Sequence, residues 1–173
     1  MLQTNHNMKS KSILRIIYVI IAICVSHSVT AQKNKTMQVL PDIEIKLQDG
    51  DSLNLKDLKG KVVLLDFWYR GCYPCLKAVP HLIELQEEFK DDLVVIGVND
   101  FDIQEDAADY FTYKKANYRS TFKTKVSLYK LFNVEGFPTT LLYDKDGNLI
   151  KADTGFSEGM MRSLRRAVKK AVQ

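Results

Sequence analysis

Hydrophobic and polar residues alternate between residues 43 and 55, a pattern typical of strands with one buried face. The apolar members of this pattern are Ile43, Ile45, Leu47, Leu53 and Leu55. The turn dipeptide Asp49-Gly50 divides them into two sets, so the segment predicts a β-hairpin. A second turn is expected at residues 57–61, around Gly60.

Three nearly continuous apolar runs follow, and each has the length of a strand that is buried on both faces. They cover residues 62–68, 93–98 and 139–143. Runs of this kind are typical of a central sheet that contains parallel strands. The last run leads through the hairpin turn Asp146-Gly147 to Leu149 and Ile150, which predict one further strand.

Helical periodicity appears between these runs. Residues 76–90 keep an apolar stripe at helical spacing, with Pro80 inside it as an expected kink. Further helices are expected at residues 103–117, where Asp102 would open the helix, at 126–132 and at 158–172. Strands that alternate with helices and end in a hairpin predict an α/β fold with a central mixed β-sheet flanked by helices.

The first 31 residues have the plan of a secretory signal peptide. Basic residues between positions 9 and 15 precede ten uninterrupted apolar residues, 16–25, and the small residues Val29-Thr30-Ala31 follow. We expect cleavage after Ala31, a flexible tail at residues 32–38 and a single domain at residues 39–173. The alternatives are a retained membrane anchor through residues 13–25, which is short for a span, or lipidation at Cys24.

Composition excludes several functional classes. The 173 residues are 46% apolar and 27% charged, which is typical of a globular domain, and no run of 18 apolar residues indicates a multi-span membrane protein. The formal charge is +4, but removal of residues 1–31 would leave 22 basic residues against 21 acidic ones. The charge therefore gives no reason to expect nucleic-acid binding.

The expected mature chain keeps two cysteines, in the motif Cys72-Tyr73-Pro74-Cys75, where a buried strand becomes a helix. Free N–H groups and the dipole at a helix N-terminus favour a thiolate, so the pKa of Cys72 should fall below about 8.5. Cys72 should be the exposed nucleophile, and Cys75, one turn inward, should resolve the mixed disulfide. Half of a zinc site is the alternative, but His81 is the only imidazole in the expected mature chain.

The sequence resembles the thioredoxin superfamily, and within it the exported TlpA/ResA branch of the redoxin (AhpC/TSA) type. The residues that carry the resemblance are Asp66, Trp68, Cys72, Pro74, Cys75, Pro80, Gly136, Pro138, Thr139 and Gly155. The resemblance covers Pro41 to the C-terminus and implies a thioredoxin-like fold with an N-terminal β-hairpin extension. Gly71 is a departure, because the family more often has an aromatic residue before the first cysteine.

The resemblance also implies roles for individual residues. Pro138 would be the family's cis-proline, and Asp66, buried in an apolar run, would have a raised pKa and accept the proton of Cys75. The alternatives are a trans turn at Pro138 and a purely structural Asp66. The substrate groove would be formed by Trp68, Tyr73, Pro74, Phe137, Pro138 and Thr139. Trp68 would pack beneath the active-site loop, with plain core packing as its alternative, and Arg70 would either favour the thiolate or be a solvated surface residue.

The implied function is that of an extracytoplasmic thiol–disulfide oxidoreductase that cycles Cys72 and Cys75 between dithiol and disulfide. The expected direction is reduction of client proteins, with electrons from a membrane donor, and cytochrome c maturation is one such use in the family. We expect a monomer in the periplasm that needs no metal or organic cofactor. The alternatives are a disulfide-forming oxidase, a peroxide-reducing redoxin and a redox-inactive peptide-binding module.

Overall fold

The computed structural model describes residues 36–173, so the expectations for the signal segment, residues 1–31, lie outside the described residues. The elements, in chain order, are β1 (Glu44–Lys46), β2 (Ser52–Asn54), η1 (Leu55–Leu58), β3 (Val62–Phe67), α2 (Tyr73–Glu88), β4 (Leu93–Val98), α3 (Gln104–Lys114), β5 (Arg119–Ser120), α4 (Leu128–Leu131), β6 (Thr139–Tyr143), β7 (Leu149–Thr154) and α5 (Glu158–Ala171). No helix among them has both the length and the apolar character needed to cross a membrane.

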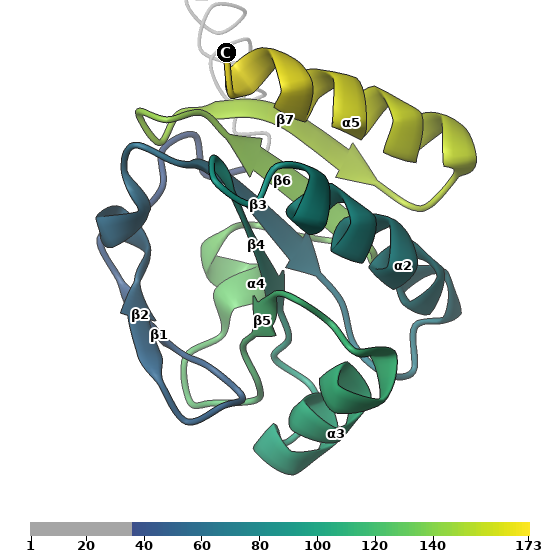
Figure 1. Cartoon of the computed structure of the whole chain (residues 1–173). Helices are drawn as coiled ribbons and strands as arrows, with labels where there is room; N and C mark the ends of the chain where they lie inside the picture. The colour runs from purple at the N-terminus through teal and green to yellow at the C-terminus, as the bar shows by residue number, and fades with distance from the viewer. Residues whose placement is uncertain (1–35) are drawn as a thin grey trace, which may run out of the picture. The chain divides into compact units, whose positions relative to one another are not determined.

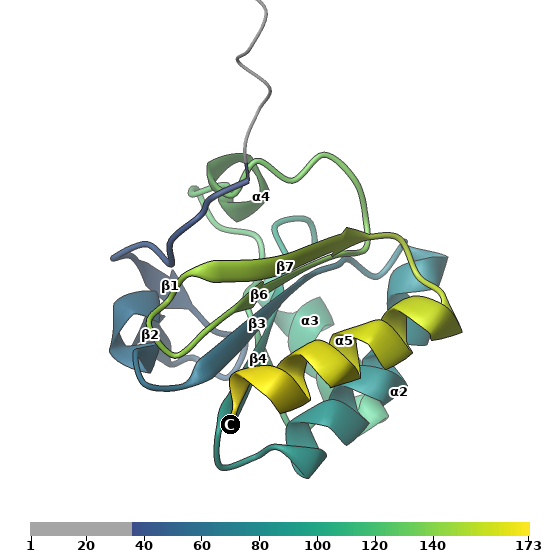
Figure 2. The same cartoon turned by 90° about the horizontal axis from the view of Figure 1, so that it is seen from above.

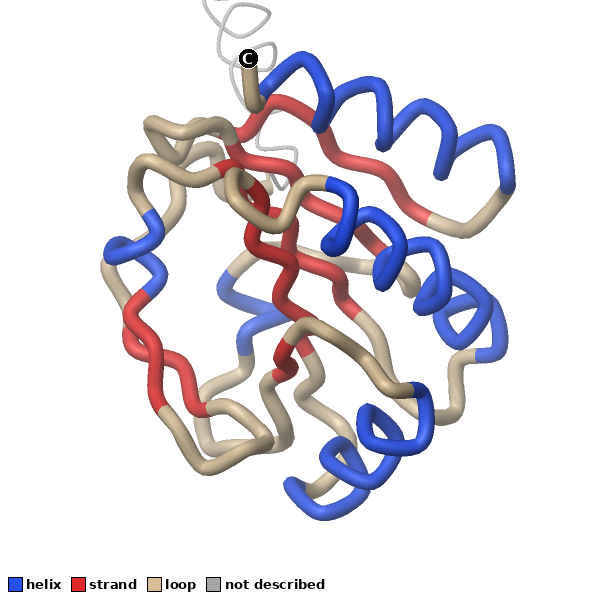
Figure 3. The backbone as a smooth tube through the Cα atoms, viewed as in Figure 1, coloured by secondary structure: helices blue, strands red, loops and turns tan. Residues whose placement is uncertain are grey.

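The centre of the fold is a five-stranded sheet in the order β5-β4-β3-β6-β7. Strands β3, β4 and β5 run parallel to one another, whereas β6 is antiparallel to both β3 and β7. Helices α2, α3 and α5 lie on one face of the sheet, and α4 lies on the other (Figures 1 and 2). Figure 3 shows the strands of this sheet at the centre, the β1–β2 hairpin at one side and helices outside, which confirms the predicted mixed sheet flanked by helices.

Strand β3 separates two hydrophobic cores. Its residues alternate between them, because successive side chains of a strand point to opposite faces. Val62 and Leu64 pack with α2, α3 and α5, whereas Val63, Leu65 and Phe67 pack with the β1–β2 hairpin and α4. All six residues of β3 are buried, so the apolar run reflects a strand covered on both sides.

Several element boundaries differ from the prediction. Helix α3 begins at Gln104 without a side-chain cap, because the Asp102 carboxylate accepts hydrogen bonds from the Arg70 backbone N–H and the Asn99 side chain instead. The helix ends at Lys114, where the left-handed Lys115 (φ 53°) stops it. The turn predicted around Gly60 is preceded by the short 3-10 helix η1, and α4 is only four residues long. Helix α2 continues through Pro80.

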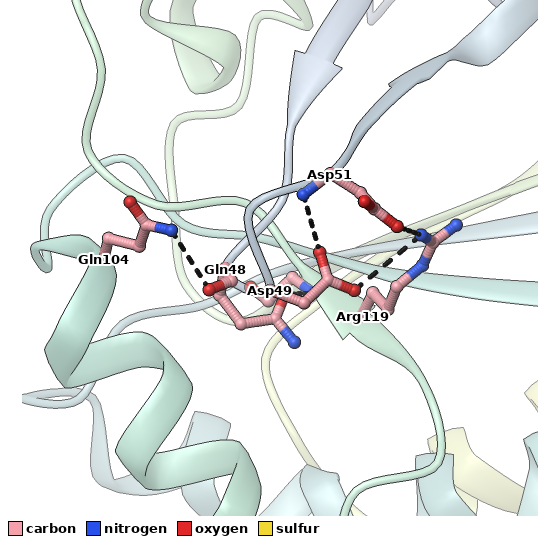
Figure 4. Close-up of polar contacts among 6 residues, drawn as sticks. Gln48, Asp49, Asp51, Gln104 and Arg119 are labelled. Atoms are coloured by element: carbon pink, nitrogen blue, oxygen red, sulfur yellow. Dashed lines mark hydrogen bonds and ion pairs between the residues drawn. The ribbon is translucent and has the colours of Figure 1, made fainter.

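The predicted β-hairpin is present, and its turn is attached to β5 by polar contacts (Figure 4). The backbone N–H of Gln48 donates to the Ser120 carbonyl over 2.9 Å, and the Ser120 N–H donates to the Gln48 side chain over 2.6 Å. Arg119 lies between Asp49 and Asp51, 3.8 and 3.4 Å away. The two-residue strand β5 was not predicted, and these contacts show that it connects the hairpin to the sheet.

Ser120 also connects β5 to the end of β3. The indole N–H of Trp68 donates to the Ser120 hydroxyl over 2.9 Å, and that hydroxyl donates to the Thr121 carbonyl over 2.9 Å. Gly97 leaves space for this pair, since a Cβ atom there would lie 2.8 Å from both the Trp68 nitrogen and the Ser120 oxygen. Trp68 is therefore held by a buried hydrogen bond just before the cysteine motif.

We predict that Ser120→Ala lowers the free energy of unfolding by about 1–3 kcal/mol, because it leaves the buried Trp68 N–H without an acceptor. Urea unfolding followed by circular dichroism measures this change. The matched control is Ser52→Ala, which removes an exposed hydroxyl and should change stability by less than about 0.5 kcal/mol. Equal effects of the two substitutions would contradict the assigned role of the Trp68–Ser120 bond.

Candidate active site

Cys72 and Cys75 form a disulfide across the first turn of α2, with Cα atoms 5.2 Å apart. Cys72 is the N-cap of the helix, and its sulfur accepts a hydrogen bond of 3.3 Å from the Cys75 backbone N–H. Pro74 lies in the first turn, where a residue without an N–H costs no helical hydrogen bond. The motif thus places both sulfurs at the positive end of the helix dipole.

The exposure of the two cysteines differs less than the sequence predicts. Cys75 is fully buried, as expected, but only 5% of Cys72 is exposed in the disulfide form. The small accessible area at the disulfide therefore belongs to Cys72. Tyr73 and Pro74, the residues between the two cysteines, are exposed, with 68% of Tyr73 accessible to solvent.

The Phe137–Pro138 peptide bond is cis, which confirms the conformation expected for Pro138. The Thr139 hydroxyl donates to the Gly136 carbonyl over 2.8 Å and lies 3.0 Å from the Thr154 hydroxyl. The Gly155 N–H donates to the Pro138 carbonyl over 2.7 Å. These bonds tie the loop to the end of β7 and give Pro138 a defined position.

The predicted groove residues occupy different depths. Trp68 is fully buried and Thr139 and Pro138 are also buried, whereas Phe137 is partly exposed. Trp68 and Thr139 therefore lie below the surface, and the predicted groove residues that solvent reaches are Tyr73, Pro74 and Phe137. Arg70 forms an ion pair with Asp106 of α3, so its partner here is a carboxylate and not a sulfur.

Four aromatic rings form a cluster, and only one of them, Phe137, was predicted as a site residue. Phe101 contacts Tyr69, Tyr129 and Phe137, with ring centroids 5.2–5.4 Å apart, and 45% of Phe101 is exposed. Tyr69 also packs edge-on against Phe137 at 5.4 Å. A signal was present in the sequence, since Tyr69 and Phe101 each follow the carboxyl end of one of two adjacent parallel strands.

Asp66 is fully buried in β3, and neither carboxyl oxygen has a hydrogen-bond partner among the described residues. Alternation along β3 directs its side chain to the same face as Leu64 and Trp68, which is the face covered by α2 and its two cysteines. Burial disfavours the charged form and raises the pKa of Asp66 to about 7. A carboxyl group that titrates near neutral pH can exchange protons with its surroundings there.

Two tyrosines near Asp66 were also missed. The hydroxyl oxygens of Tyr110 and Tyr118 are buried and have no hydrogen-bond partner among the described residues. Burial, with a smaller contribution from the Asp66 charge, raises the pKa of Tyr110 to about 12 and that of Tyr118 well above its usual value. Both phenols therefore stay protonated at neutral pH and lie within electrostatic range of the carboxyl group.

Comparison with known proteins identifies relatives with the same chemistry. Residues 36–165 match the AhpC/TSA family model. The chain is 35% identical to the thioredoxin-like protein YneN of Bacillus subtilis over 113 residues, covering 64% of this chain and 66% of YneN. It is 32% identical to the thiol-disulfide oxidoreductase ResA of Bacillus cereus over 116 residues, covering 66% of this chain and 67% of ResA. The matches thus span about two thirds of these relatives.

A solved structure from Chlorobium tepidum, provisionally named thiol:disulfide interchange protein DsbE, has the same fold. It superimposes with a TM-score of 0.73 and 27% identity, covering 80% of this chain and 99% of that one.

The pKa of Asp66 predicts how stability depends on pH. Between its ordinary value of 3.8 and about 7, the folded protein holds a proton that the unfolded chain has released. The free energy of unfolding should therefore fall as the pH rises through this window, by roughly 4 kcal/mol for this group. Asp66→Asn should remove this dependence, leaving the variant more stable than the parent at pH 8 but similar at pH 4.

Urea unfolding of the oxidised parent and the Asp66→Asn variant across this pH range measures the difference. Other titrating groups cancel when the two curves are subtracted. Parallel curves, with a constant offset at every pH, would contradict the raised pKa of Asp66.

Proposed function

The chain belongs to the AhpC/TSA family and is a TlpA/ResA-like thiol–disulfide oxidoreductase of the thioredoxin superfamily, and we propose that it reduces disulfides of client proteins outside the cytoplasm. The observation that carries this proposal is the Cys72–Cys75 pair at the start of α2, on the same side of β3 as the buried Asp66 carboxyl. The sulfurs carry both electrons of the reaction, so the cycle needs no further redox group.

The proposed cycle begins with the reduced pair. The Cys72 thiolate, favoured by the N-terminus of α2, attacks one sulfur of a client disulfide, and the other client sulfur leaves as a thiolate. Cys75 then gives its proton to the Asp66 carboxylate and attacks the Cys72 sulfur. The mixed disulfide breaks, the second client thiolate leaves, and the Cys72–Cys75 disulfide forms. Two electrons pass to the client, whose thiolates take up protons.

The surface around the disulfide supports a role in binding polypeptides. Tyr73 and Phe101 are exposed, and they lie in the segments that follow β3 and β4. Phe137 directly precedes the cis-proline. Aromatic side chains at such a surface supply contact area at low conformational cost. We propose that a client segment lies along Tyr73, Pro74, Phe137 and Pro138, with its disulfide at Cys72.

The proposed partners and location follow from the resemblance and the N-terminal sequence. A membrane thiol–disulfide donor would return electrons to the Cys72–Cys75 disulfide, and cytochrome c maturation is one pathway in which such a monomeric reductase would serve. Residues 1–31 would direct export to the periplasm and then be removed.

We predict that the native protein begins near Gln32, because the basic, apolar and small-residue segments of residues 9–31 match a cleavable signal. N-terminal sequencing of the protein recovered from the extracytoplasmic fraction tests this expectation. A mature chain that retains Lys9 or Arg15 would show that the segment remains as an anchor.

The order of attack predicts which cysteine variant traps clients. Cys75→Ser should accumulate client proteins as mixed disulfides, because Cys72 attacks but nothing resolves the adduct. Cys72→Ser should trap none, since Cys75 is fully buried. A non-reducing gel of each variant from its native compartment measures the adducts, which should disappear when an external thiol is added.

The double variant, with both cysteines replaced by Ser, is the control for adducts that form through other routes. Equal trapping by the two single variants would contradict the assigned order of attack. An absence of adducts from both would contradict the oxidoreductase cycle and favour a peptide-binding module.

A further inference from the structure

Four buried oxygen atoms on the α2 side of β3 have no hydrogen-bond partner within residues 36–173. They are both carboxyl oxygens of Asp66 and the hydroxyl oxygens of Tyr110 and Tyr118. Tyr118 is part of the hydrophobic cluster that contains Cys72 and Cys75, and Tyr110 packs against that cluster. Buried polar atoms in folded proteins are normally satisfied by protein groups or by ordered water.

Ring packing holds the two tyrosine rings beside Trp68 and Phe111. The Tyr110 ring packs on Trp68 at a centroid distance of 5.1 Å, and the Tyr118 ring packs edge-on against Phe111 at 5.0 Å. Phe111 in turn contacts Trp68 at 5.2 Å. Trp68 is itself held by the Ser120 hydroxyl, so the tyrosines are supported by a rigid set of neighbours.

Two cysteines and two tyrosines lie on the face of the sheet to which the Asp66 side chain is directed, and the Asp66 charge acts on both tyrosines. Helix α2 contributes Cys75 and Cys72, while α3 and the loop after it contribute Tyr110 and Tyr118. The residues paired with Asp66 on the neighbouring strands, Gly97 and Thr140, carry no charge. A nearby positive charge is that of Lys114, whose Nζ lies 5.8 Å from the centroid of the Tyr110 ring.

We propose that Tyr110 and Tyr118 are positioning residues whose hydroxyls hold bridging water against the Asp66 carboxylate, and that this water carries away the proton received from Cys75. The inference rests on the proposed function, in which Asp66 is the base for Cys75. Water suits the site because the four oxygen atoms have no direct partner in the described part of the chain, and two hydroxyls and a carboxyl supply the contacts that a buried water requires. The Tyr110 hydroxyl is buried but the residue as a whole is partly exposed, so we place the outlet of the proton to solvent beside Tyr110.

The proton balance of the step is simple. Cys75 loses its proton to Asp66 as its sulfur bonds to Cys72 and the client thiolate departs. Asp66 then passes the proton to the bridging water, and the water passes it outward past Tyr110. The tyrosines gain and lose no net proton, and their hydroxyls stabilise the carboxylate form of Asp66 by hydrogen bonding through the water.

The test is the pH dependence of a single turnover of the reduced protein with a model peptide disulfide. Trp68, the one tryptophan of the chain, provides the fluorescence signal. At peptide concentrations where the rate no longer depends on concentration, the slow step is the attack by Cys75. The rate should rise with pH as Asp66 becomes charged, and Tyr118→Phe and Tyr110→Phe should each move the midpoint upward by about one pH unit.

Two control variants separate this effect from loss of stability. Tyr143→Phe removes a buried hydroxyl on the opposite face of the sheet, where it donates to the Met37 carbonyl over 3.0 Å. It should lower stability without moving the midpoint. Tyr113→Phe, on the same helix as Tyr110 but 78% exposed, should change neither. Urea unfolding shows whether each variant is folded. If Tyr118→Phe fails to fold, Tyr110→Phe alone still tests the proposal.

The outcomes distinguish this inference from the proposed function. If Asp66→Asn abolishes the pH dependence while both tyrosine variants keep the parent's midpoint, the tyrosine–water path is wrong and the role of Asp66 stands. If Asp66→Asn keeps the parent's profile, the role of Asp66 fails and the path fails with it. A midpoint that moves equally in Tyr143→Phe would show a general effect of stability and would also overturn the path.

Discussion

Strand β3 is covered on both faces, and this constraint determines where the groups of the site lie. Because side chains alternate along the strand, Leu64, Asp66 and Trp68 are directed toward α2, while Leu65 and Phe67 are directed toward α4 and the hairpin. The strand ends at Phe67, and a short loop leads to Cys72 at the start of α2. A carboxyl, an indole and two sulfurs are therefore brought to one side of the sheet by a single strand and the helix that follows it.

This arrangement has a free-energy cost, which arises from the burial of the Asp66 carboxyl group. This carboxyl group has no hydrogen-bond partner among residues 36–173, which is unfavourable in an apolar environment, and an apolar residue of similar size would stabilise the strand better. The other residues of β3 are apolar, as expected for a strand that is buried on both faces, so Asp66 is the one exception in this strand. The proposed proton exchange with Cys75 would give this carboxyl a function, since burial raises its pKa to about 7, where it can accept the proton of a thiol near neutral pH.

Much of the fold could be predicted because the hydrophobic patterns that indicate its elements lie within short segments of the sequence. The alternation at residues 43–55 predicted the hairpin, and the apolar runs predicted β4 and β6 with their observed bounds. Strand β5 has only two residues, so it has no periodicity to detect, and its contact with Gln48 depends on residues 72 positions apart. The cysteines and Asp66 were identifiable from their positions after and within a buried strand. Tyr110 and Tyr118 were not, because their relation to Asp66 depends on how α3 packs against the sheet.

The pKa of Asp66 is the most direct measure of this account. Titration of the oxidised protein, followed through the carboxyl ¹³C chemical shift and assigned by comparison with Asp66→Asn, reports this group without interference from free thiols. The expected midpoint is about 7, well above the ordinary value of 3.8. A midpoint near 3.8 would show that the carboxyl is solvated or paired, and it would contradict the role of a buried base beneath the Cys72–Cys75 pair.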